Sequence, residues 1–188
     1  FDIESYTRLC LGLDYALLRK PFIQASSTVK NPNSWFISFG GTDYLNLTEK
    51  ALQAIHDDPR VDSITVVIGD AYKYIENLKN YPKATIEKNL TAEEMADVMC
   101  KAQYAILPSS SVCIEALACR CKVAAGFFVS NQQPYHDEWS RNGFILGLGN
   151  IAENIHSSII DQLSESSLYV QVAFTNIVSK YIEIFKQL

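Results

Sequence analysis

Three short stretches of the sequence carry groups that could hold an anion or a sugar. The first is FGGTDYLN, in which Gly40 and Gly41 follow an apolar segment and Thr42 comes next. Glycines permit positive φ and a close approach of the backbone, so amide groups there can point at a phosphate or a sugar. A tight turn between a strand and a helix would use the same glycines, and both interpretations stay open. Asp43 would repel a phosphate, so we expect it to accept from a hydroxyl or to cap a turn.

The second stretch, AILPSSSVCIEALACR, combines three serines with a carboxylate. Ser109, Ser110 and Ser111 follow an apolar segment, and a helix is predicted to begin directly after them. The first N–H groups of a helix lack internal partners and its dipole adds positive potential, so this helix start could cradle a diphosphate. Glu115 lies about one turn further on and could accept two hydrogen bonds from a ribose diol. An ordinary serine cap followed by a glutamate on the helix surface fits the same residues.

The third stretch, FVSNQQPYHDEW, offers side-chain amides. Asn131 and Gln132 suit sugar hydroxyls and carry no charge that would repel phosphate, although they could equally cap the helix that follows. His136 is the histidine nearest to these stretches, whereas His56 and His156 are expected to be solvated. Metal-ligand spacing, a Walker pattern and G-x-G-x-x-G are all missing from the sequence. We therefore expect no metal and no cofactor, and neither ATPase nor dinucleotide chemistry.

The segments that must position these residues alternate between strand and helix. Strands are predicted at Trp35–Phe39, Ser63–Ile68, Ala84–Lys88, Tyr104–Leu107, Val123–Phe127 and Phe144–Leu148. Helices are predicted between them at Asn46–His56, Ala71–Asn80, Ala92–Ala102, Val112–Ala118 and Gln133–Arg141. This alternation, with near-continuous apolar strands, predicts an α/β fold: a Rossmann-like parallel sheet of about six strands with helices on both faces.

Two pairs of residues have the spacing of helix capping boxes, Asn46 with Glu49 and Thr91 with Glu94. Two further helices are predicted at the end of the chain, Ile151–Leu163 and a long one from Leu168 to about Gln187. The apolar stripe of the last helix consists of Val170, Phe174, Ile177, Val178, Tyr181, Ile184 and Phe185.

Composition limits the classes of protein and partner. The chain has 188 residues, 48% of them hydrophobic, which is enough for one sizeable core. Its net charge of -5 argues against nucleic acid as a partner. Apolar runs all fall well short of the roughly 20 residues that span a bilayer, so we expect no membrane span and a cytoplasmic location. The five cysteines show no C-x-x-C pair and are expected to pack as reduced thiols.

Taken together, four segments resemble the C-terminal nucleotide-binding half of GT-B fold enzymes. These segments are LGLDYALLRKPF, FGGTDYLNL, SSSVCIEAL and FFVSNQ, and the resemblance covers nearly all of residues 9–149. GT-B enzymes include the UDP-GlcNAc transferases of peptidoglycan synthesis. The sequence is most similar to the UDP-2,4-diacetamido-2,4,6-trideoxy-β-L-altropyranose hydrolases of pseudaminic acid biosynthesis, a route to a bacterial polysaccharide sugar.

The resemblance implies a role for each stretch. Glu115 would bind the uridine ribose, while Ser110, Ser111 and their amides would bind the diphosphate of UDP or a UDP-sugar. Gly41 and Thr42 would lie near the phosphates or the sugar, and Asn131 and Gln132 would approach the sugar. The backbone near Asn89 and Leu90 would read the uracil.

The sequence also departs from this family. The hydrolases place a catalytic histidine in a glycine-rich loop of an N-terminal domain, and none of the three histidines here lies in such a loop. The resemblance implies that residues 1–33, with Tyr15, Leu18 and Arg19, are an interdomain linker and lead-in segment. Residues 34–188 would then be the UDP-sugar-binding domain, inactive without the N-terminal domain of the same protein. Serines also replace glycines common at the helix start.

Three functions fit the sequence. The first is one half of a hydrolase that attacks the anomeric carbon with water and releases UDP. The second is the nucleotide-sugar-binding half of a glycosyltransferase, in which an acceptor hydroxyl replaces water. A non-catalytic α/β binding or scaffold domain is the third.

Overall fold

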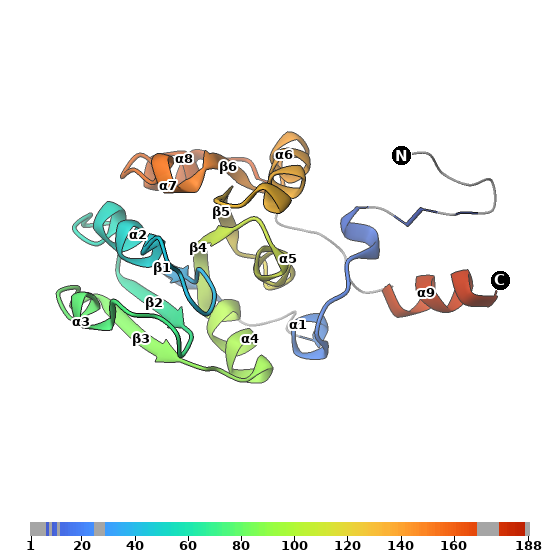
Figure 1. Ribbon diagram of the computed structural model, residues 1–188, viewed down its shortest axis with the longest axis horizontal. Helices are drawn as coiled ribbons and strands as arrows, with labels where there is room; N and C mark the ends of the chain where they lie inside the picture. Colours follow the sequence, from blue (N-terminus) through green and yellow to red (C-terminus); the bar gives the residue numbers. More distant parts are fainter. Residues whose placement is uncertain (1–6, 8, 11, 25–28, 169–176, 187–188) are drawn as a thin grey trace.

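The computed structural model describes residues 7, 9–10, 12–24, 29–168 and 177–186, and these form one six-stranded sheet between two layers of helices (Figure 1). The strands are β1 Asn31–Ile37, β2 Ser63–Ile68, β3 Ala84–Lys88, β4 Ala102–Pro108, β5 Lys122–Phe127 and β6 Leu146–Asn150. The α-helices are α1 Lys20–Gln24, α2 Leu47–Ile55, α3 Ile75–Leu78, α4 Ala92–Lys101, α5 Ser111–Ala118, α6 Gln133–Arg141, α7 Ile151–Asn154, α8 Ile159–Glu165 and α9 Ile177–Lys186. Two 3-10 helices, η1 Leu13–Tyr15 and η2 Ser130–Gln132, complete the described elements.

All neighbouring strands of the sheet run parallel, in the order β3-β2-β1-β4-β5-β6. This confirms the predicted Rossmann-like α/β class. The chain crosses from β3 at one edge back to the centre, where β4 pairs with β1. In an open parallel sheet, a crevice for ligands opens at the carboxyl ends of the strands where the order reverses. That point is the β1–β4 pair.

Successive residues of the strands pack into two separate cores. Phe36 and Val67 face the layer that contains α1, α4, α5 and α6. Trp35 and Ile37 face the layer of α2, α3, α7 and α8, where Trp35 stacks on Tyr104 with ring centroids 4.8 Å apart. Because helices cover both faces, the strands need apolar residues at consecutive positions, which is the pattern seen in the sequence.

All six strands were predicted, but only β2 and β3 have the predicted bounds. β1 runs Asn31–Ile37 instead of Trp35–Phe39, β4 runs Ala102–Pro108 instead of Tyr104–Leu107, and β5 begins at Lys122 instead of Val123. The last strand was predicted at Phe144–Leu148 but begins at Leu146. Gly143 turns with φ +71° and the Phe144 N–H bonds Trp139 O at 2.9 Å, so this residue still belongs to the end of α6.

Two predicted helices were wrong in extent. Only Ile75–Leu78 of the predicted Ala71–Asn80 is helical, because Tyr72 turns back on Gly69 and donates its hydroxyl to Asn46 at 2.6 Å. The predicted helix Ile151–Leu163 is interrupted, since Ile155 is extended (φ −84°, ψ 108°) where its side chain packs against the core. His156, which we expected within that helix, lies in the exposed connection between α7 and α8.

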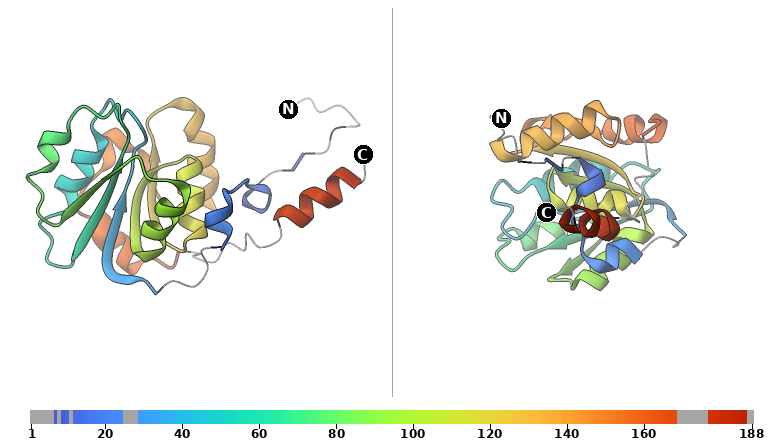
Figure 2. Two further views of the ribbon diagram at one scale, coloured as in Figure 1. Left: turned by 90° about the horizontal axis from the view of Figure 1, so that it is seen from below. Right: turned by 90° about the vertical axis from the view of Figure 1, so that its right-hand side faces the viewer.

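The described part of the final helix contacts η1 through Tyr181 and Lys180, and part of its predicted apolar stripe is exposed. Of the predicted Leu168–Gln187, residues 169–176 lie outside the described part, and so do the stripe positions Val170 and Phe174. Helix α9 extends away from the sheet and lies beside η1 (Figure 2), where Tyr181 donates to Tyr15 O at 2.6 Å. Val178 and Phe185 are exposed, because the sheet does not reach this helix.

The five cysteines form no disulfide in the described structure, and four of them are buried, in agreement with the prediction of packed thiols. Burial raises the pKa of Cys121 to about 11, and a hydrogen bond with the Cys119 thiol lowers the pKa of the buried Cys100 below its usual range. Lys30 donates to Cys119 O at 2.6 Å and to Met99 O at 3.3 Å, so one ammonium caps the carboxyl ends of both α4 and α5. Within the described ranges no helix is long and apolar enough to span a membrane.

The helix starts show one capping box, not two. Thr91 and Glu94 form the predicted box at α4. At α2, the predicted cap Asn46 is left-handed (φ 53°) and makes no side-chain cap bond. Asp43 caps this helix instead, accepting from the N–H groups of Leu47 and Thr48, both at 2.8 Å. The expectation that Asp43 caps a turn is therefore confirmed, because its buried carboxylate needs partners that the glycine turn places within reach.

Replacing Asp43 tests this cap. We expect Asp43→Ala to lower the free energy of unfolding by about 1–2 kcal/mol, because two N–H groups at a helix start lose their acceptor. Asp43→Asn keeps an acceptor oxygen and tolerates the positive φ of 35°, so it should lose less. Urea unfolding followed by circular dichroism measures both, and an Asp43→Ala protein as stable as the parent would contradict the assignment.

Candidate functional site

A cavity of about 540 Å³ lies at the carboxyl ends of β1, β4 and β5, at the reversal of strand order. Loops after these strands form most of its wall, and the segment before β1 adds Leu17 and Arg19. Five of the residues predicted for a binding site line it: Gly40, Ser110, Ser111, Glu115 and Gln132. A cavity of this size suits a ligand as large as a nucleotide.

Six other predicted residues do not line the cavity: Gly41, Thr42, Ser109, Asn131, Asn89 and Leu90. Gly41, Thr42 and Asn131 are exposed on the same loops that reach it. The side chain of Asn89 donates to Asp70 at 2.7 Å, and Leu90 packs against the core beneath α4. If Asn89 and Leu90 recognise a base, they would do so through their backbone groups, and this role stays a prediction.

The serine-led start of α5 is not capped by serine. Ser110 is the N-cap residue, in an extended conformation, and its hydroxyl makes no cap bond, so it stays available to the cavity. Ser109 is fully buried: its N–H bonds Gly126 O at 2.8 Å, and its hydroxyl has no partner among the described residues. The alternative of an ordinary serine cap does not describe this helix. Because the Cys113 N–H bonds Ser110 O at 2.9 Å, the N–H groups that this helix start could offer to an anion are those of Ser111 and Val112, beside the hydroxyls of Ser110 and Ser111.

Glu115 is not a surface residue of α5. It is only 7% exposed, lines the cavity, and forms a bidentate ion pair with Arg19 at 2.8 and 3.0 Å. This hydrogen bonding raises the pKa of Arg19, whose guanidinium also lies 4.9 Å from the ring centroid of Phe22. The pair cancels the charge of the carboxylate, and two lone-pair positions of Glu115 remain for further donors. A carboxylate so neutralised can stand next to a phosphate.

The bend after β1 depends on a contact between two glycines. Gly40 has φ +84°, which favours glycine. Gly41 passes so close to Gly69, after β2, that a Cβ on Gly69 would lie 2.5 Å from Gly41 Cα. With Asp43 capping α2, this contact holds the loop against the crevice.

The loop after β5 presents a hydrogen-bond donor. The side-chain oxygen of Gln132 accepts from Phe128 N at 3.2 Å, which leaves its NH2 group to donate into the cavity. Although Gln132 is the N-cap residue of α6, its side chain makes no cap bond there. The alternative role as a helix cap therefore does not apply to this residue.

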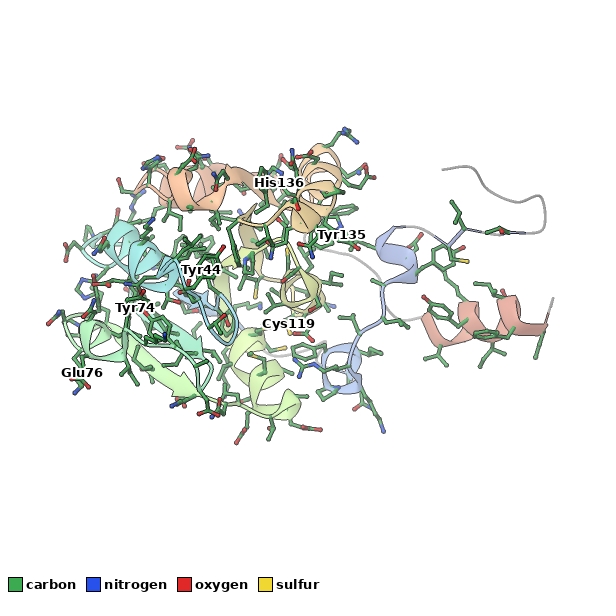
Figure 3. The ribbon with its side chains drawn as sticks, viewed as in Figure 1. Tyr44, Tyr74, Glu76, Cys119, Tyr135 and His136 are labelled. Carbon is green, nitrogen blue, oxygen red and sulfur yellow. The ribbon has the colours of Figure 1, made fainter. Side chains whose placement is uncertain are left out.

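Two histidines are held within the structure. His136, from α6, accepts from Gly149 N at 3.0 Å through Nε2 and bonds Asp137 at 2.8 Å through Nδ1 (Figure 3). The Nε2 bond joins α6 to β6, while the Nδ1 bond stays within α6, so both ring nitrogens already have protein partners. His56, which we expected in solvent, is partly buried and packs edge-on against Tyr81. In the described ranges, His, Cys, Asp and Glu form no group of three or more that could hold a metal ion.

Sequence reasoning missed the apolar wall of the cavity. Leu17, Met95, Val112 and Phe128 line it, and each belongs to or adjoins an element next to the sheet's carboxyl edge. Met95 and Val112 lie in the first turns of helices that follow β3 and β4. Their position shortly after a strand could have indicated a place in the site. An apolar residue at such a position cannot, however, be distinguished in sequence from a residue of the core.

Comparisons with known proteins show which fold this chain shares. No family model matches the sequence. The uncharacterized protein MJ1062 of Methanocaldococcus jannaschii is 28% identical over 152 residues, covering 74% of this chain and 31% of that protein. The chain therefore spans about a third of the length of that relative.

Three solved structures are similar in fold. The UDP-GlcNAc 2-epimerase of Neisseria meningitidis, bound to UDP-GlcNAc, has a TM-score of 0.62 at 14% identity, covering 83% of this chain and 46% of that one. The spinosyn rhamnosyltransferase SpnG has a TM-score of 0.54 at 15% identity, and the match covers 84% of this chain and 42% of SpnG. A further UDP-N-acetylglucosamine 2-epimerase has a TM-score of 0.54 at 12% identity, and the match covers 91% of this chain and 47% of that epimerase. The fold is that of a GT-B-like domain, and the chain spans less than half of each of these structures.

The contact between the glycines gives a stability test with a matched control. We expect Gly69→Ala to lower the free energy of unfolding by about 1–3 kcal/mol, because the new methyl group overlaps Gly41 backbone. Gly41→Ala adds a methyl group with no heavy atom within 4 Å and should change stability by less than about 0.5 kcal/mol. Equal effects of the two substitutions in urea unfolding would show that the loops do not approach as described.

Proposed function

We propose that this chain binds a UDP-sugar in the crevice cavity. The diphosphate would rest on the first N–H groups of α5 with the hydroxyls of Ser110 and Ser111, and Glu115 would accept from the ribose diol. The observation that supports this most is the open start of α5, one turn from a buried carboxylate whose charge Arg19 already balances. The fold neighbours named as UDP-GlcNAc epimerases and as a rhamnosyltransferase support the same ligand class.

The remaining predicted residues take secondary roles in this proposal. Gly40, Gly41 and Thr42 approach the phosphates or the sugar from the β1–α2 loop. Asn131 and Gln132 do so from the β5–α6 loop, where the Gln132 NH2 group can donate to an oxygen. The base would lie against the apolar wall of the cavity, near Leu17 and Met95, with backbone recognition from residues 89–90.

For the whole protein we propose a two-domain enzyme in which residues 1–33 are the linker and residues 34–188 the nucleotide-binding domain. Similarity of LGLDYALLRKPF and SSSVCIEAL to the pseudaminic acid hydrolases favours hydrolysis at the anomeric carbon, with UDP as leaving group. In that reaction this chain would stabilise the departing diphosphate by preorganised amides, and each well-placed donor contributes about 3 kcal/mol. The second candidate, glycosyl transfer, is favoured by the fold likeness to SpnG.

Glu115 is the residue to test. We expect Glu115→Ala to weaken UDP binding by about 1.5–3 kcal/mol, because the ribose loses a charged acceptor. Glu115→Gln keeps the shape of the side chain and should also weaken binding. Glu76→Ala, on the exposed helix α3 (Figure 3), is the matched control and should leave the affinity unchanged. Isothermal titration with UDP measures all four proteins.

Selectivity separates ligand binding from a scaffold role. A ligand that binds only the native state raises the unfolding temperature by mass action, so UDP should do so and ADP should do so less. No shift with millimolar UDP would favour the scaffold domain, whereas an unchanged UDP affinity in folded Glu115→Ala protein would contradict only the role given to Glu115.

A further inference from the structure

Two aromatic rings meet above the carboxyl edge of the sheet. Tyr44, in the β1–α2 loop, and Phe128, after β5, pack edge to face with ring centroids 6.2 Å apart and an interplanar angle of 68°. Phe128 lines the cavity, whereas the Tyr44 side chain is 60% exposed beside it. The pair thus joins two loops that come from opposite sides of β4, the strand that leads to the diphosphate cradle.

The backbone that carries Tyr44 is held on both sides. Asp43 precedes it and is fixed by its cap on α2, and the Tyr74 hydroxyl donates to Tyr44 O at 3.5 Å. Asn46, two residues later, accepts from the Tyr72 hydroxyl at 2.6 Å. Figure 3 shows Tyr44 and Tyr74 side by side in front of the sheet. Because the backbone that carries this exposed ring is already anchored, a ligand could bind the ring without the entropic cost of ordering the loop.

Polar donors line the same cavity as Phe128. Phe128 N bonds the side-chain oxygen of Gln132, which ties Gln132 to the Phe128 backbone and leaves its NH2 group to donate, and Ser110 lines the cavity as well. An aromatic surface bordered by donors is complementary to a pyranose, which has an apolar C–H face and an edge of hydroxyl oxygens. Glu115 lies five residues into the helix from Ser110, or about 7 Å along its axis, so a pentose there and a hexose at the rings would flank the diphosphate.

We propose that Tyr44 and Phe128 form an aromatic platform on which the sugar of the UDP-sugar packs through its C–H face. This rests on the proposed function and extends it: the sugar, and not only the nucleotide, is recognised by this half of the protein. The platform assigns discrimination between sugars to two aromatic side chains, one in the β1–α2 loop and one directly after β5. It also explains why a large aromatic side chain stays in solvent at the mouth of a polar cavity.

The test compares UDP-GlcNAc with UDP in the 188-residue chain. Tyr44→Leu keeps an apolar side chain without a ring, and because Tyr44 is exposed the variant should fold. We expect Tyr44→Leu to weaken UDP-GlcNAc binding five- to tenfold and to change UDP binding less than twofold, as measured by titration calorimetry. Tyr135→Leu is the control, since Tyr135 is similarly exposed (56%) but packs on Trp139 and does not line the cavity (Figure 3).

A spectroscopic measurement detects the contact itself. Saturation of the aromatic protons should transfer to the ring protons of GlcNAc in the parent protein, and this transfer should fall in Tyr44→Leu and persist in Tyr135→Leu. If UDP binds but the ratio of the two affinities and the transfer are the same in every variant, the platform is wrong and the nucleotide site stands. If neither UDP nor UDP-GlcNAc binds the parent protein, the proposed function fails and the platform fails with it.

Discussion

The reversal of strand order between β1 and β4 is the constraint on which the rest of this structure depends. Because the connections from these two central strands leave in opposite directions, their carboxyl ends cannot both be covered by one crossover. The loops after β1, β4 and β5 therefore meet around an open space instead of a packed core. All three stretches that were singled out in the sequence end in that space. These stretches are up to about 90 residues apart along the chain, but the sheet brings them together at one cavity.

Charge is balanced in this crevice before any ligand arrives. A buried carboxylate next to a phosphate site would be costly unless it were paired, and Arg19 supplies the pair from a segment outside the sheet. The same arginine therefore links the chain before β1 to helix α5, and Leu13 and Phe22 of that segment are buried in the core of that layer. A segment that the sequence presents as a linker is thus part of the site. An anion at the start of α5 would meet helix amides and hydroxyls, with no net negative charge from Glu115.

In the β1–α2 loop, one buried polar residue fixes the conformation of its neighbours. Asp43 uses both carboxylate oxygens on α2, which removes it as a ligand group and fixes the residues on either side of it. Gly41 then lies against Gly69, and Tyr44 is turned toward Phe128 across the crevice. Rigid turns of this kind allow a loop to present a binding surface without a large entropic cost.

The fold class, the positions of most strands and the three loops could be predicted from sequence, because they depend on local periodicity and on residues that break it. Asn46 shows the limit of local rules: it has the spacing of a cap, but its backbone is left-handed and it makes no cap bond. Asp43 accepts from the N–H groups of Leu47 and Thr48 instead. The break at Ile155 likewise follows from packing against a distant core, which no window of sequence contains. Ser110 and Glu115 were open between a binding role and an ordinary cap with a surface glutamate. Tertiary structure decided that Glu115 is buried, that Arg19 is its partner across 96 residues, and that Phe128 and Tyr44 meet, because these facts depend on which elements the sheet brings together.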